Sequence, residues 1–242
     1  MSVSAHVMWH DLECGGYAAD LPLWDELAAH AGGEVLDVGA GTGRVALRLA
    51  RAGHRVTALD RDAELLAVLA ERAGAAGLGV RTVVADAAGF DAGNGRFSLV
   101  AVPMQTIQLL PGAAGRAGFF ASARRALAPG GLVALAIADA LEGFEPHDAL
   151  PAPDAGELDG RRFESQPVAV CERDGHVRIE RVRRIVAPDG EVSAEEDRVE
   201  LARVSPRGLA AEAAAHGLRA GATRRVEATG DHVGSEVVLL HG

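Results

Sequence analysis

The sequence predicts an α/β fold: a doubly wound, mostly parallel seven-stranded sheet with helices on both faces. Two observations support this prediction. Between residues 33 and 139, short apolar runs that suit buried strands alternate with helical patterns. The first of these runs leads directly into a turn with glycines at alternate positions, and a helical pattern follows. Successive strand–turn–helix units build parallel sheets through right-handed crossovers.

The elements follow in order along the chain. Residues 1–32 are expected to be helical, because Leu21, Leu23, Trp24 and Leu27 can share an apolar face before Gly32 ends the helix. The first strand is expected in the apolar part of residues 34–44, and the later core strands at 55–60, 80–87, 97–102 and 132–139. Helices are expected at 45–50 and 207–216, and two closing strands at 222–226 and 233–241.

The pattern changes after residue 139. Residues 140–160 contain three prolines and many acids, which predicts a loop. Residues 161–204 contain two Asp-Gly pairs between alternating apolar runs, which predicts a three-stranded antiparallel insert. Residues 205–242 then return to the main sheet. The whole chain, 1–242, is expected to be a single domain of ordinary size.

The glycine turn is the most informative segment. Asp37, Gly39, Gly41 and Gly43 follow an Asp-x-Gly-x-Gly-x-Gly spacing, whereas a dinucleotide fingerprint would place its last glycine where Arg44 stands. Glycines let a ligand approach the main chain. Asp37 would repel a pyrophosphate, so the turn suits a ligand that carries a positive charge.

Two more acids follow predicted strands. Asp60 ends the second strand, where a carboxylate can accept both hydroxyls of a ribose in several nucleoside-binding folds. Asp86 closes the third strand. Three strand-terminal acids in succession are far more specific than any one of them.

Residues 34–44 resemble motif I of the class I S-adenosylmethionine-dependent methyltransferases. Residues 97–105, with the Pro103-Met104-Gln105 turn, and residues 127–139 resemble later motifs of that family, and 138–142 is similar to a stretch in small methyltransferases of an actinobacterial type. The resemblance implies a Rossmann-like fold and S-adenosylmethionine as cofactor. It also implies methyl transfer to a small-molecule acceptor, at oxygen or nitrogen rather than carbon.

The resemblance also implies roles for individual segments. Asp86 would accept a hydrogen bond from the adenine amino group, and residues 1–32 and the insert would cover the acceptor above the core of residues 33–139. The expected cofactor contacts are Asp37, Gly39, Ala40, Gly41, Gly43, Arg44, Asp60, Arg61, Asp86, Ala87, Pro103 and Met104.

Methyl transfer from a sulfonium does not require a general base, because the cofactor supplies the reactivity. The candidates near the methyl group are Tyr17, Gln105, Asp139 and His147. Each also has a structural interpretation. Tyr17 could be a core or lid hydroxyl, Gln105 could cap a backbone group, Asp139 could cap a loop, and His147 could be a solvated loop residue.

The charge, the apolar runs and the cysteine content of the chain limit its partners and its cellular location. A net charge of −10 disfavours nucleic acid, and the basic run at 181–184 is expected to pair across strands, with Arg183 and Arg184 beside Glu195 and Glu196 to within one register step. No apolar run reaches the ~20 residues of a membrane helix. Two cysteines indicate a reducing cytoplasm. We expect a monomer or homodimer, without a metal, since His6 and His10 have no third ligand.

Two alternatives from other classes stay open. A nicotinamide-dependent oxidoreductase would share the glycine turn and Asp60 but would leave Asp37 and Asp86 unexplained. A non-catalytic partner domain that binds S-adenosylmethionine would keep the acids without an acceptor pocket.

Overall fold

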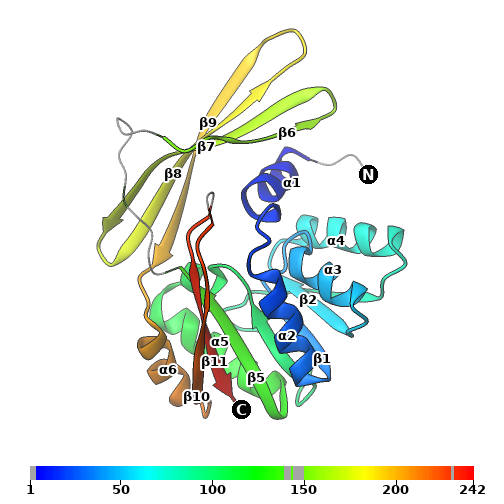
Figure 1. Ribbon diagram of the computed structural model, residues 1–242, viewed down its shortest axis with the longest axis vertical. Coiled ribbons are helices and arrows are strands. Elements are labelled where there is room, and N and C mark those ends of the chain that lie inside the picture. The colour runs from blue at the N-terminus through cyan, green and yellow to red at the C-terminus, as the bar shows by residue number, and fades with distance from the viewer. Residues whose placement is uncertain (1–3, 139–142, 144–149, 230–231) are drawn as a thin grey trace. The chain divides into compact units, whose positions relative to one another are not determined.

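The computed structural model describes residues 4–138, 143, 150–229 and 232–242 (Figure 1). Its backbone contacts group the chain into two compact units. The larger unit comprises residues 18–140 and 204–242, and the smaller comprises residues 1–17 and 141–203. The N-terminal residues 1–17 therefore group with the insert rather than with the core sheet.

The larger unit contains the predicted seven-stranded sheet, in the order β10-β11-β5-β4-β1-β2-β3. Strands β1 to β5 are parallel to one another, and β11 pairs antiparallel with both β5 and β10. The fold prediction is therefore confirmed. The strands are β1 (Glu34–Val38), β2 (Val56–Asp60), β3 (Val80–Val84), β4 (Phe97–Val102), β5 (Leu127–Ile137), β10 (Arg219–Val226) and β11 (Ser235–His241).

Strand β5 begins earlier than the sequence predicts. The strand was expected to begin at residue 132, but it already includes residues 127–131, with Leu127 paired to Phe97. The register shifts between this pair and the next, Leu99 with Leu132, so the glycines of the Pro-Gly-Gly stretch are accommodated by an irregularity inside the strand.

Helices cover both faces of the sheet. Because side chains alternate along a strand, Leu36 and Val38 of β1 point to one face and Asp37 to the other. The first face forms a continuous apolar core with Phe119 and Phe120 of α5, and with α6. The helices of this unit are α2 (Leu21–Ala31), α3 (Arg44–Arg51), α4 (Ala63–Ala75), η2 (Thr106–Leu109), α5 (Gly112–Ala126) and α6 (Pro206–Ala214).

The smaller unit is built on an antiparallel sheet in the order β6-β7-β8-β9. The sequence predicts only three strands here and assigns residues 140–160 to a loop. The fourth strand, β6, pairs with β7 through a tight turn in which Asp159 and Gly160 have φ of 51° and 73°. The four strands are β6 (Asp154–Leu158), β7 (Arg161–Arg173), β8 (His176–Val186) and β9 (Val192–Ala202).

Two short helical segments complete the smaller unit: α1 (Ala5–His10) and η1 (Asp11–Gly15), a single π-helical turn. Glu13 of η1 accepts two hydrogen bonds from the guanidinium of Arg183, at 2.8 and 2.7 Å, and one from Ser165 at 2.7 Å. Trp9 packs edge-on against Phe163, with 4.9 Å between ring centroids. These contacts join the N-terminal residues to the insert.

The predicted register of the basic run is confirmed to within the one step that the prediction allowed. Arg183 lies opposite Glu195, whereas Arg184 lies one step from its expected partner, opposite Ala194. Arg183 also forms a closer ion pair with Asp197, at 3.0 Å. The central arginine of the basic run is therefore occupied by carboxylates of its own unit.

Two helix glycines provide a matched test of the packing. A Cβ at Gly118 in α5 would collide with the carbonyl oxygen of Ala88, whereas a Cβ at Gly74 in α4 would have no atom within 4 Å. We expect Gly118→Ala to lower the free energy of unfolding by about 1–3 kcal/mol through overpacking. Gly74→Ala should raise it by up to about 1 kcal/mol, because alanine favours a helix over glycine. Urea denaturation of both variants tests this; equal effects would contradict the packing of α5 described here.

A charged edge with a buried carboxylate

The three acids singled out from the sequence lie at the carboxyl edge of the parallel strands. Asp37 is the fourth residue of β1, Asp60 ends β2, and Asp86 follows β3 by two residues. Strands β1 and β4 are neighbours, and the strand order reverses between them. Open α/β sheets bind ligands outside the carboxyl ends of their strands, at such a switch point.

The glycine turn after β1 is held in place by backbone contacts. Gly39, Gly41 and Gly43 have φ of 74°, 52° and 98°, which disfavour any other residue. The amides of Gly39 and Ala40 donate to the carbonyl of Leu59, at 2.8 and 3.1 Å. The turn is therefore fixed to the end of β2.

Two of these glycines are also required by close packing. A Cβ at Gly39 would collide with the side chain of Thr106, and a Cβ at Gly43 would lie 2.8 Å from Leu69. Part of the glycine pattern thus serves the protein's own packing, and within residues 39–43 the exposed position is Gly39.

Asp60 links the turn to the next helix. Its Oδ2 accepts a hydrogen bond from the amide of Gly41 at 2.8 Å, and its Oδ1 accepts one from Asp62 at 3.0 Å. A carboxylate has about four acceptor positions, so each oxygen retains capacity for a ligand hydroxyl. The side chain is oriented before any ligand binds.

Asp37 is buried, with 1% of its surface exposed, between Ala58 of β2 and Ala101 of β4. Neither carboxylate oxygen has a hydrogen-bond partner among the described residues. Burial raises the pKa of Asp37 from its ordinary 3.8 to about 7; the guanidinium of Arg44 and the nearby backbone amide of Ala46 oppose this rise, and the carboxylates of Asp60 and Asp20 add to it. A cationic ligand would stabilise the ionised form.

Arg44, an expected cofactor contact, is engaged by a residue of α2's N-terminus. Its Nη1 and Nη2 donate to the two oxygens of Asp20 at 2.5 and 2.9 Å, and Trp24 Nε1 donates to the same carboxylate at 2.8 Å. Asp20 is itself 1% exposed. The pair therefore joins α2 to the start of α3, and contact between Arg44 and the cofactor stays a prediction.

The residues after β2 and β3 are more open. Asp86 is exposed, and its Oδ1 accepts the amide hydrogen of Ala88 at 2.8 Å. Arg61 is exposed and Ala87 is half-buried. All three come from the carboxyl ends of neighbouring strands, as expected for adenosine contacts, but their roles stay predictions.

The turn after β4 contains a strained residue. Met104 has φ of 54°, and the other non-glycine residues with positive φ, Asp159 and Asp174, lie in hairpin turns of the smaller unit among the described residues. Strained backbone is common at functional sites. Thr106 then donates to the carbonyl of Pro103 at 3.2 Å, and Gln105 accepts from Gln108 and Leu109 through its carbonyl.

The sequence interpretation missed Gln108. Its side chain is buried, its Nε2 donates to the carbonyl of Ala138 at 3.1 Å, and its Oε1 accepts from the amide of Ala138 at 2.8 Å. The side chain of Gln108 thereby makes the two backbone hydrogen bonds that a neighbouring strand would make with the residue after β5. A glutamine three residues beyond Gln105, within an otherwise apolar stretch, was the available signal.

The catalytic candidates are distributed over both units and over positions outside the described residues. Tyr17 is buried within the smaller unit, Gln105 lies at the carboxyl edge, and Asp139 and His147 lie outside the described residues. Among the residues that the structure describes, no group of three or more potential metal ligands occurs, and no helix is long and apolar enough to cross a membrane.

Comparison with known proteins finds a family match that includes the residues of this edge. Residues 35–131 match a family described as a methyltransferase domain. That match spans β1 to β5 and so contains the glycine turn and all three acids. No curated protein sequence matches the chain.

Several solved structures share the fold. One is S-adenosylmethionine-bound CalS10, an amino pentose methyltransferase from Micromonospora echinaspora, at 19% identity and TM-score 0.72, covering 100% of this chain and 98% of that one. The sugar N-methyltransferase KedS8 from Streptoalloteichus has 19% identity and TM-score 0.73, with 98% and 93% covered. DesVI from Streptomyces venezuelae has 20% identity and TM-score 0.72, with 98% of each chain covered.

The buried carboxylate predicts a pH dependence of stability. Between pH 3.8 and about 7, the folded protein holds a proton on Asp37 that the unfolded chain has lost. The unliganded protein should therefore lose stability as the pH rises through this window, by roughly 2–4 kcal/mol in total. Asp37→Asn should remove this contribution to the pH dependence of stability. Compared with the wild type at the same pH, the variant should therefore be more stable at pH 8 than at pH 5.

Urea denaturation at both pH values measures the effect. Asp25→Asn is the control, because Asp25 is a partly exposed carboxylate paired with Arg48 on the same unit. It should keep the wild-type slope. A slope that survives in Asp37→Asn would mean that Asp37 is ionised in the folded protein.

Proposed function

We propose that this methyltransferase, which uses S-adenosyl-L-methionine, transfers the methyl group to an amine nitrogen of a small molecule. The enzyme class rests on the methyltransferase domain at residues 35–131. The choice of nitrogen and of a small acceptor is our proposal, and it goes beyond the domain match.

The observation that carries the cofactor assignment is the buried Asp37. Burying a carboxylate without a partner is costly unless a counter-ion arrives. The cofactor carries an ammonium group on its methionine end and a sulfonium at its centre. A ligand with this charge next to the glycine turn would satisfy the oxygens that the described residues leave without hydrogen bonds.

The other two acids would hold the nucleoside. We assign the ribose hydroxyls to Asp60, whose two oxygens are already oriented by the amides of Gly41 and Asp62. We assign the adenine amino group to Asp86. The main chain of the glycine turn, which is exposed at Gly39, would then lie along the link between the methionine and ribose portions.

Bound at this edge, the cofactor supplies an electrophilic methyl group on a positively charged sulfur. The chain therefore has to orient an acceptor in line with the carbon–sulfur bond and keep water away. Gln105 and the strained Met104 follow β4 at this edge and are suited to acceptor contact. Tyr17, Asp139 and His147 stay candidates for the same role.

Two arguments support an amine acceptor. CalS10 is an amino pentose methyltransferase and KedS8 is a sugar N-methyltransferase; MtfA, at 24% identity and TM-score 0.59, is a glycopeptide N-methyltransferase. The net charge of −10 also favours an acceptor that arrives as an ammonium ion. The nitrogen of such an acceptor has to lose a proton before its lone pair can attack the methyl group. Asp139 or His147 could accept this proton.

The role of Asp60 can be tested by cofactor binding. Asp60→Ala removes charge-assisted hydrogen bonds to the ribose and should weaken S-adenosylhomocysteine binding by about 2–3 kcal/mol, or roughly 30- to 150-fold in Kd. Asp60→Asn keeps an acceptor for the amide of Gly41 and should fall between this variant and the wild type. Asp25→Ala is the matched control, with no effect expected. Calorimetry measures all four proteins; unchanged affinity in Asp60→Ala would refute the assignment.

The acceptor class can be tested by methyl transfer. Labelled S-adenosylmethionine is incubated with panels of small amines, their hydroxyl analogues and polynucleotide. We expect label in amines and none in polynucleotide, together with calorimetric binding of S-adenosylhomocysteine but not of NAD or NADP. Labelling of a hydroxyl compound with its amine analogue left unlabelled would overturn the nitrogen assignment while leaving the enzyme class intact.

A further inference from the structure

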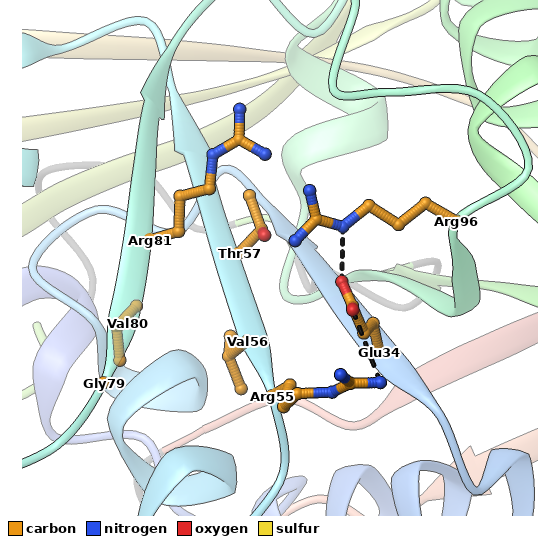
Figure 2. A pocket seen from close by; sticks show the side chains of 8 residues that line it. All are labelled: Glu34, Arg55, Val56, Thr57, Gly79, Val80, Arg81 and Arg96. Carbon is orange, nitrogen blue, oxygen red and sulfur yellow. Dashed lines mark hydrogen bonds and ion pairs between the residues drawn. The ribbon is translucent and has the colours of Figure 1, made fainter.

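A pocket lies at the opposite edge of the same sheet. Its volume is about 380 Å³, near the lower end of the range for small-molecule sites. It opens at the amino-terminal ends of the strands: Glu34, Val56 and Val80 are the first residues of β1, β2 and β3. The lining is completed by Arg55, Thr57, Gly79, Arg81 and Arg96 (Figure 2).

The pocket is positively charged although the protein is acidic overall. Its lining contains three arginines and one carboxylate. Glu34 accepts a hydrogen bond from Arg96 and forms an ion pair with Arg55 at 3.4 Å. The hydrogen bond from Arg96 holds the pKa of Glu34 below its usual range, so this carboxylate stays ionised and cancels one positive charge. Two positive charges remain in excess.

Structural roles account for only part of this lining. Arg55 and Arg96 neutralise Glu34, which is only partly exposed. Arg81, in contrast, makes no ion pair or hydrogen bond through its side chain with any residue that the structure describes. Only its charge acts on Glu34. The guanidinium of Arg81 is therefore available to a ligand.

Thr57 is a second group that the protein itself does not use. It is 3% exposed in a strand whose neighbours Val56, Ala58 and Leu59 are apolar, and its hydroxyl makes no hydrogen bond with a described residue. Figure 2 shows its side chain between the guanidinium groups of Arg81 and Arg96. A hydroxyl donor flanked by two guanidinium groups is an arrangement suited to an oxyanion.

We propose that this pocket binds the phosphate group of a small phosphorylated molecule through Arg81, Arg96 and Thr57. A phosphate monoester carries a charge of about −1.5 to −2 at neutral pH, which matches the excess of the lining. The guanidinium fork fits phosphate oxygens better than an ammonium does. The pocket has room for more than a bare phosphate, so an ester is favoured over the free ion.

The site is independent of the cofactor edge. The three phosphate contacts come from the start of β2, the start of β3 and the residue before β4, whereas the cofactor acids lie at or beyond the other ends of the strands. The proposal is therefore tested by phosphate binding to the whole chain, with the cofactor edge saturated with S-adenosylhomocysteine. If phosphate does not bind, the methyltransferase assignment is unaffected.

The probes are glucose 6-phosphate, orthophosphate and unphosphorylated glucose, each titrated by calorimetry at ionic strength matched with sodium chloride. We expect saturable binding of the two phosphates, tighter for the ester, and none for glucose. Arg81→Gln should weaken phosphate binding about tenfold or more, since it removes a charge-assisted contact. Thr57→Val, nearly isosteric, should weaken it by about threefold to tenfold.

Arg225→Gln is the charge-matched control, because Arg225 is an exposed arginine of β10 outside the pocket. It should bind phosphate like the wild type, and all variants should bind S-adenosylhomocysteine with unchanged affinity. Orthophosphate binding as tightly as the ester would overturn the assignment of an ester, because the site would then recognise the phosphate group alone. No saturable heat with either phosphate, or equal affinity in Arg81→Gln and the wild type, would overturn the proposal.

Discussion

The cofactor edge depends on one unmet interaction, the buried carboxylate of Asp37. Arg44 is close enough to lower its pKa, yet the guanidinium of Arg44 is bound on both branches by Asp20. Asp20 therefore keeps a neighbouring cation from neutralising Asp37 completely. In the unliganded protein, a proton on Asp37 avoids the cost of burying an ionised carboxylate. A cationic ligand can take the place of that proton. The site thus prefers a ligand with a positive charge before any shape is considered.

The rest of the edge is arranged so that such a ligand meets a fixed surface. The carbonyl of Leu59 and the carboxylate of Asp60 hold the glycine turn, and Thr106 packs against Gly39 from the far side of the switch point. Gln108 holds the backbone of Ala138 in the same region. Little chain entropy is left to lose when the ligand binds, so more of its interaction energy appears as affinity.

Sequence patterns predicted the elements that periodicity and glycine spacing determine. The parallel strands, the end of α2 at Gly32 and the position of the three acids followed from local patterns. Strand β6 was missed because Asp154, Ala155 and Gly156 have weak strand propensity; only the turn at Asp159-Gly160 marked it. Position 156 in this strand has to be glycine, because a Cβ there would collide with the side chains of Met8 and Leu12. Contacts of this kind, and the Asp20–Arg44 pair 24 residues apart, depend on tertiary packing and leave no local signal.

The polarity of the parallel sheet explains why its two edges favour opposite charges. Helices α3 and α4 begin at the carboxyl edge, so their positive dipole ends lie there with Asp37, Asp60 and the N-cap Asp62. Their negative ends lie at the other edge, where α3 finishes at Arg51 and α4 has Arg72 in its last turn. The negative helix ends stabilise arginine side chains at that edge. Once Glu34 has neutralised one of the three in the pocket, the remaining charge is held in place by the fold itself, and an anion is the ligand that it suits.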